Sequence, residues 1–308
     1  MPNISIIIPN YNHENYLNQR IESVLDQSYQ DYEIIILDDC STDNSKEIIE
    51  KHRSHPKVTH VVYNKQNSGS TFKQWKKGIE LAKGKYIWIA ESDDYSEKCF
   101  LNKCLIALEF DKEINLCFAQ SYRVDENNYV ISDLLDCYTK KFNSPFIQNG
   151  KSYIKDFLWN ENNIFNASAV IFKKDLYPTD ENHIVKFKFV GDWLAYIKIL
   201  ETGKIAYLPD RLNYFRTHRS SVTAQLNRSK IHLIESYFIL SYIKTNRLYN
   251  SRKKIDSRFN YLAGLILHNN PNLNDLKYLI SLDNLFVFRA SGIILKYIIK
   301  KGFSMLKK

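Results

Sequence analysis

Apolar runs alternate with amphipathic segments along the first 95 residues of the chain. The runs are continuous and rich in β-branched side chains, as expected of strands that are buried on both faces. Between the first two runs, four apolar residues fall on one face of a helix: Leu17, Ile21, Val24 and Leu25. This alternation predicts an α/β fold with a mostly parallel central sheet flanked by helices. The four predicted strands are residues 4–8, 32–37, 59–63 and 85–90.

The polar breaks between these runs predict where the helices begin and end. Ser41 and Thr42 suit the N-cap of the helix that follows the second strand. After a turn at residues 67–70, the next helix is expected to end near Ala82, with Gly84 closing its C-terminal side.

Beyond residue 95 the pattern is less regular. From about residue 231 the tail is mostly helical by pattern, with one clear break at residues 269–274. Before the tail we expect a helix over 96–110, a strand over 116–124, a hairpin near 126–128, a strand over 167–172, a helix from 193 to about 203, and a last strand over 205–208 that ends at Pro209.

Three of the first four strands end in polar residues. Residues 9–12 follow the first strand, Asp38 and Asp39 close the second, and residues 91–94 close the fourth. Because crossovers between parallel strands are nearly always right-handed, these ends collect along one edge of the sheet. Ligands of open α/β sheets bind beyond that edge. The sequence therefore predicts one ligand site made from all three strand ends.

The chemistry of these strand ends has two interpretations. Glu91, Asp93 and Asp94 can form a solvated acidic turn, or they can bind Mg²⁺ or Mn²⁺, which prefer oxygen ligands and neutralise a diphosphate. The pair at residues 38–39 can cap a helix or accept hydrogen bonds from a nucleobase or ribose. Tyr11 can stack on a base, or it is an ordinary turn residue in a chain with 21 tyrosines.

Four segments together resemble the motifs of family 2 glycosyltransferases with the GT-A fold, in the family's order and spacing. They are residues 4–12, 36–45, 67–69 and 91–94. The resemblance implies an inverting, metal-dependent hexosyltransferase that moves one sugar from a nucleotide-sugar donor, usually a UDP-sugar, to an acceptor hydroxyl of a glycan or glycolipid in surface polysaccharide biosynthesis. It implies Mn²⁺ or Mg²⁺ as the cofactor.

The resemblance covers roughly residues 1–222, which we divide into a nucleotide half (about 1–95) and an acceptor half (about 96–222). Residues 223–308 are expected to form a helical C-terminal extension. The family's pattern implies a base pocket at Pro9 and Tyr11, with Asp39 bonded to the base, Ser92 facing the ribose and Asp93 on the metal. The donor-binding residues implied in this way are Pro9, Tyr11, Asp38, Asp39, Asn67, Glu91, Ser92, Asp93 and Arg216.

The later motifs imply the catalytic residues. Residues 190–193 resemble the segment that contains the family's catalytic base, which makes Asp192 the candidate to deprotonate the acceptor hydroxyl. Its other interpretation is an N-cap of the helix that starts at Trp193. In the segment 214–222, Arg216 or Arg219 can bind a diphosphate in bidentate fashion. His218 is implied as a second metal ligand, and a structural role is its alternative.

Several positions depart from the family's pattern. Glu91 stands where aspartate is commonest, and its greater length argues against direct contact with the metal. Gly191 replaces the usual acid beside the base. Cys40 stands at a common glycine position, which predicts a backbone there without a positive φ. The arginine often found after Asn67 is missing, and Lys73 or Lys76 is expected to replace it.

The composition of the chain indicates which classes of ligand and which cellular compartment suit the protein. The formal charge of +9, from 43 Lys and Arg against 34 Asp and Glu, suits an anionic partner such as a nucleotide or acidic lipid, and we assign no nucleic acid. Five cysteines without zinc or redox spacing, and no signal peptide at Met1, predict reduced thiols in a cytoplasmic protein. No apolar run is long enough to cross a bilayer, and a Gln-x-x-Arg-Trp motif is absent, which favours a non-processive enzyme.

The last residues of the tail have two interpretations. From Leu285 onward, basic residues interrupt an apolar run, as in helices that lie in the plane of a membrane. Peripheral contact with the inner face of the membrane would suit an acceptor on a polyprenyl carrier. Alternatively, this helix packs on the catalytic domain or on a partner in a homodimer.

Two other functions compete with glycosyl transfer. A nucleotidyltransferase would need a glycine-rich phosphate loop after the first strand, and residues 9–12 contain no glycine. A non-catalytic nucleotide-sugar-binding or scaffold protein of the same fold has no need of Asp93, Asp192 and His218, which the chain retains.

Overall fold

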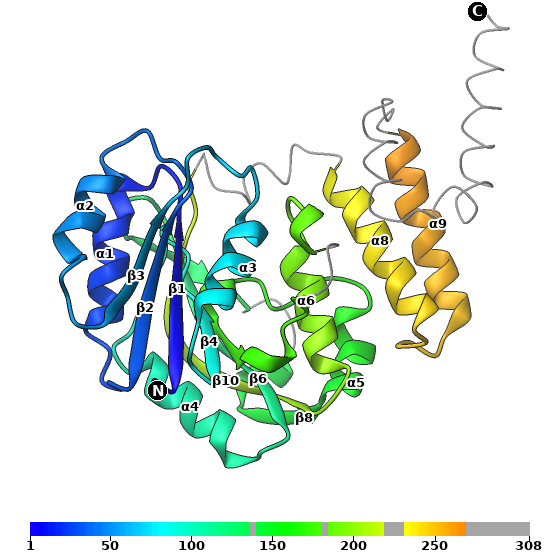
Figure 1. The fold of residues 1–308 in the computed structure, drawn as a ribbon. Helices are drawn as coiled ribbons and strands as arrows, with labels where there is room; N and C mark the ends of the chain where they lie inside the picture. The colour runs from blue at the N-terminus through cyan, green and yellow to red at the C-terminus, as the bar shows by residue number, and fades with distance from the viewer. Residues whose placement is uncertain (136–139, 180–183, 219–230, 269–308) are drawn as a thin grey trace, which may run out of the picture.

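The computed structural model describes residues 1–135, 140–179, 184–218 and 231–268. Their centre is a mixed sheet of ten strands, ordered β3-β2-β1-β4-β9-β6-β10-β5, with β7 paired to β6 and β8 paired to β10 (Figure 1). The strands are β1 (Ile4–Asn10), β2 (Tyr32–Asp38), β3 (Val58–Tyr63), β4 (Tyr86–Ile89), β5 (Tyr95–Ser96), β6 (Ile114–Val124), β7 (Val130–Asp133), β8 (Phe146–Asn149), β9 (Val170–Lys173) and β10 (Lys204–Arg216).

Helices cover both faces of this sheet, as the sequence predicted. Because successive strand residues point to opposite faces, Ile6 and Ile8 of β1 belong to one apolar cluster and Ile7 to the other. The first cluster includes residues of α1, α2 and α4, and the second includes residues of α3, α6, α8 and α9. The helices are α1 (Glu14–Leu25), α2 (Ser45–His52), α3 (Thr71–Leu81), α4 (Phe100–Phe110), α5 (Gly150–Tyr153), α6 (Gly191–Leu200), α8 (Ile231–Thr245) and α9 (Arg252–His268).

Residues 1–95 have the predicted parallel order. β1 pairs in parallel with both β2 and β4, and β2 pairs in parallel with β3. Further along the chain, β9 is antiparallel to both β4 and β6, so the complete sheet is mixed. The expected hairpin after β6 is present, with Asn128 at a φ of 69° before β7.

The prediction that the last strand ends at Pro209 was wrong. β10 continues to Arg216, and its register against β6 shifts between Leu208 and Arg211. A proline cannot donate a ladder hydrogen bond, and this irregular stretch needs none at that position. As a result, Arg216 lies at the edge of the sheet where β4 also ends, and its Nε donates to the carbonyl of Asp93.

Two residues that were predicted to mark helix ends, Ser41 and Gly84, have other roles in the structure. Helix α2 begins after Asn44, while Ser41 Oγ donates to Asp38 Oδ1, at 2.6 Å, instead of capping the helix. Gly84 does not close α3 with a left-handed backbone. It is needed because a Cβ there would lie 2.5 Å from the backbone nitrogen of Ser5, on the neighbouring strand β1.

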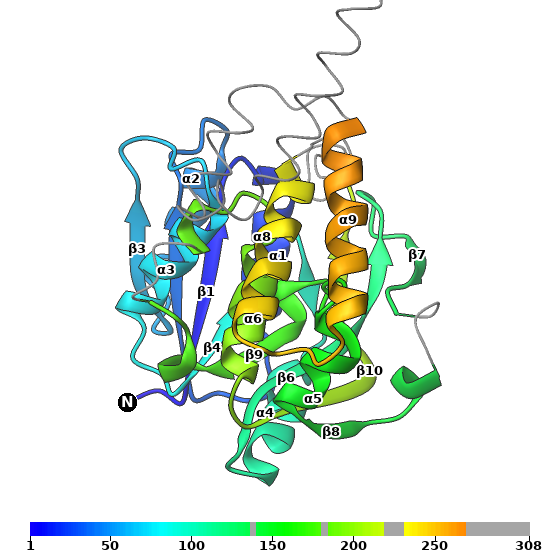
Figure 2. The same cartoon turned by 90° about the vertical axis from the view of Figure 1, so that its right-hand side faces the viewer.

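Helices α8 and α9 pack beside α6. Figures 1 and 2 show α8 lying against α6, with α9 alongside α8, and residues of all three belong to one apolar cluster. The rings of Trp159 and Tyr249 stack at 4.3 Å between centroids. A break at residues 246–251 separates α8 from α9, and it was not predicted. Two other predictions, the break at 269–274 and the helix from Leu285, lie outside the described residues. Among the helices of the described ranges, none is both long and apolar enough to span a bilayer.

Candidate active site

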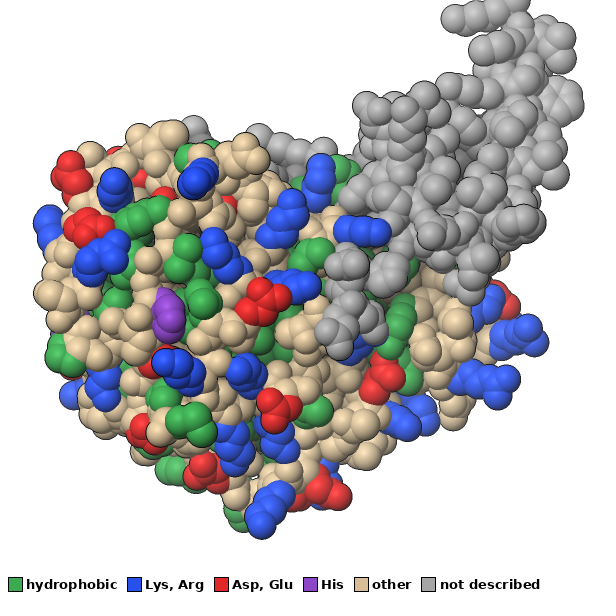
Figure 3. Space-filling view, in the orientation of Figure 1, with side chains coloured by type: hydrophobic (Ala, Val, Ile, Leu, Met, Phe, Trp, Pro, Cys, Tyr) green, Lys and Arg blue, Asp and Glu red, His purple; other side chains and the backbone are tan. Residues whose placement is uncertain are grey.

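A pocket of about 610 Å³ opens where β1, β2 and β4 end. As predicted, it brings together residues that follow all three strands. Opposite them, the wall comes from α3, from residues 165–167 and from the segment 188–192. Figure 3 shows lysine and arginine side chains spread over one face of the molecule, in keeping with the net charge of +9. The lining residues used below are Pro9, Tyr11, His13, Asp39, Asn67, Glu91, Ser92, Asp93, Asp94, Lys188, Phe189 and Asp192.

The two acids that close β2 have different environments. Asp38 is buried and does not line the pocket, and its carboxylate accepts from Asn10 Nδ2 at 2.9 Å and from the backbone N–H of Ser41 at 3.0 Å. It therefore fixes the turn after β2. Cys40 within this turn has a φ of 65°, so the expectation that its backbone needs no positive φ was wrong. A cysteine occupies the left-handed conformation because the hydrogen bonds of Asp38 define the turn around it.

Asp39 faces the pocket. Its Oδ1 accepts hydrogen bonds from Asn64 Nδ2, Ser68 N and Gln74 Nε2, at 2.5, 2.9 and 2.9 Å. Its Oδ2 accepts from Ser68 Oγ, at 2.7 Å, and from no other described residue. A carboxylate oxygen has room for a second donor, so Oδ2 is the atom that can bind a base N–H. Asp39 is thus rigidly oriented with one acceptor site to spare.

The remaining predicted donor residues at this end also line the pocket. Pro9 lies near the end of β1 and Tyr11 follows it, and Tyr11 is 44% exposed, which leaves its ring available for stacking. Asn67 also lines the pocket, and its side chain accepts the N–H of Gly69 at 2.6 Å. Asp38 is the one predicted residue of this end that does not line the pocket.

Two imidazoles and a carboxylate come together beside the pocket. His13 and Asp93 line it, whereas His218 is buried behind them and does not. His218 Nε2 lies 3.0 Å from Asp93 Oδ2, and a ligand atom of His13 completes a group whose atoms all lie within 4.8 Å of one another. Burial lowers the pKa of His13, which favours the neutral imidazole that a metal ion requires. Burial opposes ionisation of Asp93, but the hydrogen bond from His218 and the nearby imidazoles outweigh it and lower the pKa of its carboxyl.

These three residues fit a divalent cation. Two nitrogen ligands and one carboxylate oxygen suit Mn²⁺ and similar ions. His13 Nδ1 lies 2.8 Å from Ser92 Oγ, an outer contact of the kind that orients a metal-binding ring. Asp93 and His218 were predicted as ligands and His13 was not. The signal in the sequence was its position directly after the 9–12 motif.

The other two acids of the 91–94 cluster have separate environments. Burial raises the pKa of Glu91 to about 8, and Trp75 Nε1 donates to its Oε1 at 2.8 Å. Glu91 is not part of the group around His218. Burial also raises the pKa of Asp94, to about 6, and its Oδ1 accepts the backbone N–H of Arg216 at 2.8 Å.

A buried arginine that sequence reasoning missed lies under this cluster. Arg20 of α1 is fully buried and donates through Nε to the carbonyl of Glu91, at 2.9 Å. Burial lowers the pKa of its guanidinium to about 10, and the charges of Asp94 and Asp93 oppose that shift. Its positive charge thus offsets part of the repulsion among the acids of the strand end.

Arg216 does not have the predicted role. It is 1% exposed and does not line the pocket, so we withdraw the expectation that it binds the donor diphosphate. Its guanidinium has five N–H donors, and it faces five protein oxygens. They belong to the carbonyls of Asp93, Asp125 and Glu126 and to the side chains of Gln19 and Asn128. Arg219, the alternative, lies outside the described residues.

Asp192 lines the opposite wall, in the first turn of α6. The helix is capped at Val190, so Asp192 is not its N-cap. Its Oδ2 accepts from Asn162 Nδ2 at 2.9 Å, and burial raises its pKa to about 7. A base with a pKa near the working pH is the most effective proton acceptor. A Cβ on Gly191 would lie 2.9 Å from the ring of Phe72, which explains why no second acid stands there.

The expected substitutes for the missing arginine lie elsewhere. Lys73 donates to the carbonyl of Ser68 at 2.9 Å, and Lys76 pairs with Glu80 at 3.9 Å. Neither lines the pocket, whereas Lys188 does. Lys188 is therefore the lysine positioned to meet an anionic ligand.

The chain matches a family model described as Glycosyl transferase family 2 over residues 5–176. Among curated proteins, it is 39% identical over 118 residues to a putative teichuronic acid biosynthesis glycosyltransferase, TuaG, of Bacillus subtilis. That match covers 38% of this chain and 45% of TuaG, so the chain spans less than half the length of this relative.

Two solved structures resemble the whole fold. TarS 1-349 of S. aureus, in complex with UDP-GlcNAc, superposes with a TM-score of 0.59 at 18% identity, covering 99% of this chain and 92% of that one. A mannosyltransferase of Pyrobaculum calidifontis, in complex with GDP-Man and Mn²⁺, superposes with a TM-score of 0.58 at 16% identity, covering 99% and 87%.

Proposed function

The chain belongs to glycosyltransferase family 2 and has the GT-A fold, and on this premise we propose that it is an inverting transferase that moves one sugar from a nucleotide-sugar donor to an acceptor hydroxyl. One observation above all supports the proposal. His13 and Asp93 of the cation-binding group line the same pocket as the carboxylate of Asp192, whose pKa is near 7.

The donor is assigned to the end of the pocket near β1 and β2. Tyr11 offers a face to the base, Asp39 Oδ2 accepts a base N–H, and Ser92 lies beside the ribose. Pro9 and Asn67 complete this wall. We take the nucleotide to be uridine diphosphate, because a uracil N–H suits the free acceptor site of Asp39 and because TarS, of the same fold, was solved with UDP-GlcNAc.

The residues that would hold Mn²⁺ or Mg²⁺ are His13, Asp93 and His218. When bound, the ion neutralises the diphosphate that leaves the sugar. The structure of the mannosyltransferase with Mn²⁺ supports a divalent cation in this fold. Lys188 adds a positive charge to the same pocket.

Asp192 acts as the general base. Its ionised carboxylate accepts the proton of the acceptor hydroxyl while that oxygen bonds to the anomeric carbon, and the nucleoside diphosphate departs with the electrons of the broken bond. The attack comes from the face opposite the leaving group, so the sugar inverts. Asn162 orients the carboxylate by donating to Oδ2.

The acceptor is proposed to be a glycan, or a glycolipid on a polyprenyl carrier, in surface polysaccharide synthesis. The name of TuaG supports a cell-surface polymer. The four described cysteines are free thiols, which supports a cytoplasmic reaction. Contact with the membrane surface, and a homodimer as its alternative, are assigned to the basic tail.

The experiment is a thermal-shift screen of UDP-, dTDP-, GDP- and CDP-sugars with and without Mn²⁺. A ligand that binds the native state raises the melting temperature. We expect a UDP-sugar to raise it with Mn²⁺ present, and to do so far less in the Asp93→Ala variant. If no nucleotide sugar shifts the wild type, the proposed function is wrong. If a sugar binds without hydrolysis or transfer to any acceptor, a non-catalytic binding protein is the better interpretation.

A further inference from the structure

A buried glutamate of α8 accepts hydrogen bonds from three backbone N–H groups in the segment that forms one wall of the pocket. Glu235 of α8 is 0% exposed. Its Oε1 accepts from the N–H of Lys188 at 2.7 Å, and its Oε2 accepts from those of Phe189 and Val190, each at 3.0 Å. Hydrogen bonds to a charged acceptor are the strong ones, and three on one carboxylate fix the path of the segment.

This segment leads straight into the proposed base. Lys188 and Phe189 line the pocket, Val190 caps α6, and Asp192 follows in the first helical turn. The position of Asp192 therefore depends on the peptide planes that Glu235 holds.

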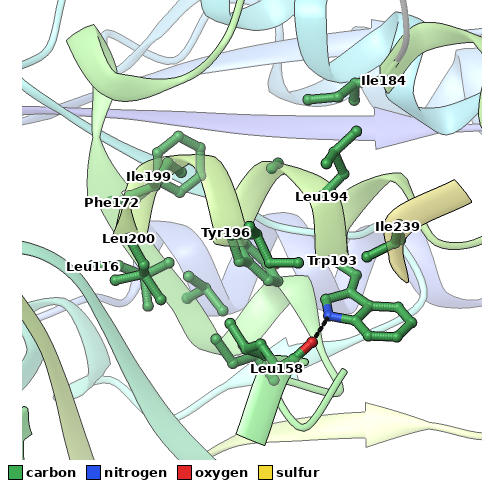
Figure 4. Close-up of a cluster of buried hydrophobic side chains, with 14 of the residues drawn as sticks. Leu116, Leu158, Phe172, Ile184, Trp193, Leu194, Tyr196, Ile199, Leu200 and Ile239 are labelled. Atoms are coloured by element: carbon green, nitrogen blue, oxygen red, sulfur yellow. Dashed lines mark hydrogen bonds between the residues drawn. The ribbon is translucent and has the colours of Figure 1, made fainter. Parts of the chain in front are cut away.

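The same helix also contacts the far end of α6. Tyr242 of α8 donates to the carboxylate of Glu201, and Lys198 donates to Tyr242 Oη at 3.2 Å. Between the two ends, Figure 4 places Ile239 of α8 beside Trp193 of α6, and the rings of Phe187 and Phe238 meet at 5.5 Å. Helix α8 thus holds α6 at both ends, and Glu235 is the contact nearest the pocket.

We propose that Glu235 is a positioning residue for glycosyl transfer, which holds the 188–190 segment so that Asp192 meets the acceptor hydroxyl. The inference rests on the proposed function and adds the C-terminal extension to the machinery of the reaction. A shift of about 1 Å in a reacting group is enough to cost on the order of 100-fold in rate.

Electrostatics gives Glu235 a second, measurable effect. Burial is the main cause of the raised pKa of Asp192, and the negative charge of Glu235 adds to it. Among the described residues, Tyr177 and Tyr196 also interact with the charge of Asp192, and burial raises their pKa values, so both stay neutral near pH 7. Lys188 is the cationic residue of the same wall. Removing the Glu235 charge should therefore lower the pKa of Asp192.

The test compares Glu235→Gln and Glu235→Asp with the wild type, and uses Glu47→Gln as the matched control because Glu47 is an exposed glutamate on α2 that does not line the pocket. We expect kcat of Glu235→Gln to fall about 10- to 100-fold while KM for the donor changes less than about threefold. Glu235→Asp should recover part of kcat. The acid limb of the kcat/KM profile of Glu235→Gln should move to lower pH, because its base ionises more readily.

Four results would each contradict the inference. An unchanged kcat in Glu235→Gln would overturn the inference, and so would a loss that merely follows the fraction of folded protein measured by circular dichroism. A wild type that binds and turns over no donor would overturn the proposed function and this inference together. Amide exchange at residues 188–190 should be faster in Glu235→Gln, and equal protection in both proteins would also contradict it.

Discussion

The two walls of the pocket are built in different ways. On the donor side, residues that end or follow neighbouring parallel strands orient two carboxylates through hydrogen bonds. Asn10 and Ser41 donate to Asp38, and Ser68 donates to Asp39. On the acceptor side, Asp192 depends on Asn162 and on the segment bound by Glu235, which come from other parts of the chain. The sheet itself brings the donor residues together, whereas packing between distant helices builds the acceptor wall.

Because the two walls are built differently, substitutions on each should impair a different step of the reaction. Changes on the donor wall should weaken nucleotide or metal binding and leave the base in place. Changes on the acceptor wall should slow turnover and leave donor binding intact. Four predictions follow this division, from the largest expected effect to the smallest.

The cation-binding group should give the largest effect. Asp93→Ala removes the carboxylate, and we expect turnover with Mn²⁺ to fall at least about 1,000-fold, since the leaving diphosphate then lacks its counter-charge. His13→Ala should weaken Mn²⁺ binding about 10- to 100-fold and Mg²⁺ binding less, because imidazole nitrogen suits Mn²⁺ better. A transfer assay with Mn²⁺ measures the fall in turnover, and calorimetric titration of Mn²⁺ measures the change in affinity.

The control for that titration is His55→Ala, which removes an exposed histidine outside the pocket. Equal Mn²⁺ affinity in His13→Ala and the wild type would remove His13 from the metal site, and would leave Asp93 and His218 as its ligands.

The raised pKa of Asp192 should appear in stability as well as in rate. Folding raises this pKa from 3.8 to about 7, so the folded protein loses stability as pH rises through that window, relative to a neutral side chain. Asp192→Asn should therefore gain about 1–3 kcal/mol over the wild type between pH 4 and pH 7. Denaturant unfolding at both pH values measures it, and a constant difference would contradict the raised pKa.

The neighbours Asp38 and Asp39 should differ in their effect on donor binding. Asp39→Asn is expected to weaken donor binding about 10-fold, since its Oδ2 has an acceptor site to spare, and also to lower the free energy of unfolding by about 1–2 kcal/mol, because its carboxylate accepts four hydrogen bonds. Asp38→Asn should lower the free energy of unfolding by about 1–2 kcal/mol, because it loses the turn contacts, and should leave donor affinity within about threefold. Equal effects of the two changes on donor affinity would refute this division of roles.

The smallest effect is expected at Cys40. Its φ of 65° suits glycine, so Cys40→Gly should remove backbone strain and raise the free energy of unfolding by about 0.5–1 kcal/mol after the entropy of glycine is subtracted. Chemical denaturation measures the change. A loss of stability would mean that the Cys40 side chain contributes more than the strain removes.

The sequence predicted the donor wall better than the acceptor wall. The ends of β1, β2 and β4 could be located from apolar runs, and parallel pairing then requires that they meet. His13 was missed because a lone histidine has no pattern of its own. Arg216 was assigned to the diphosphate because a motif says nothing of burial, and the continuation of β10 past Pro209, which buries it, was itself not predicted.

The acceptor wall was predictable only at Asp192. Nothing in the pattern around Glu235 distinguishes it from an exposed helical acid, because its partners are backbone N–H groups that have no sequence signature. The family resemblance stops near residue 222, and the family model matches residues 5–176. The contacts of α8 with the pocket wall therefore could be identified only in the structure.

The most direct test of the account is single-turnover transfer by Asp192→Asn, with donor binding measured on the same preparation. We expect the wild type to transfer the sugar in the presence of Mn²⁺ and the variant to bind the donor with unchanged affinity while its transfer rate falls about 10²- to 10⁴-fold. A variant that transfers at the wild-type rate would show that Asp192 is not the base, and would contradict the division of the pocket into a donor wall and an acceptor wall.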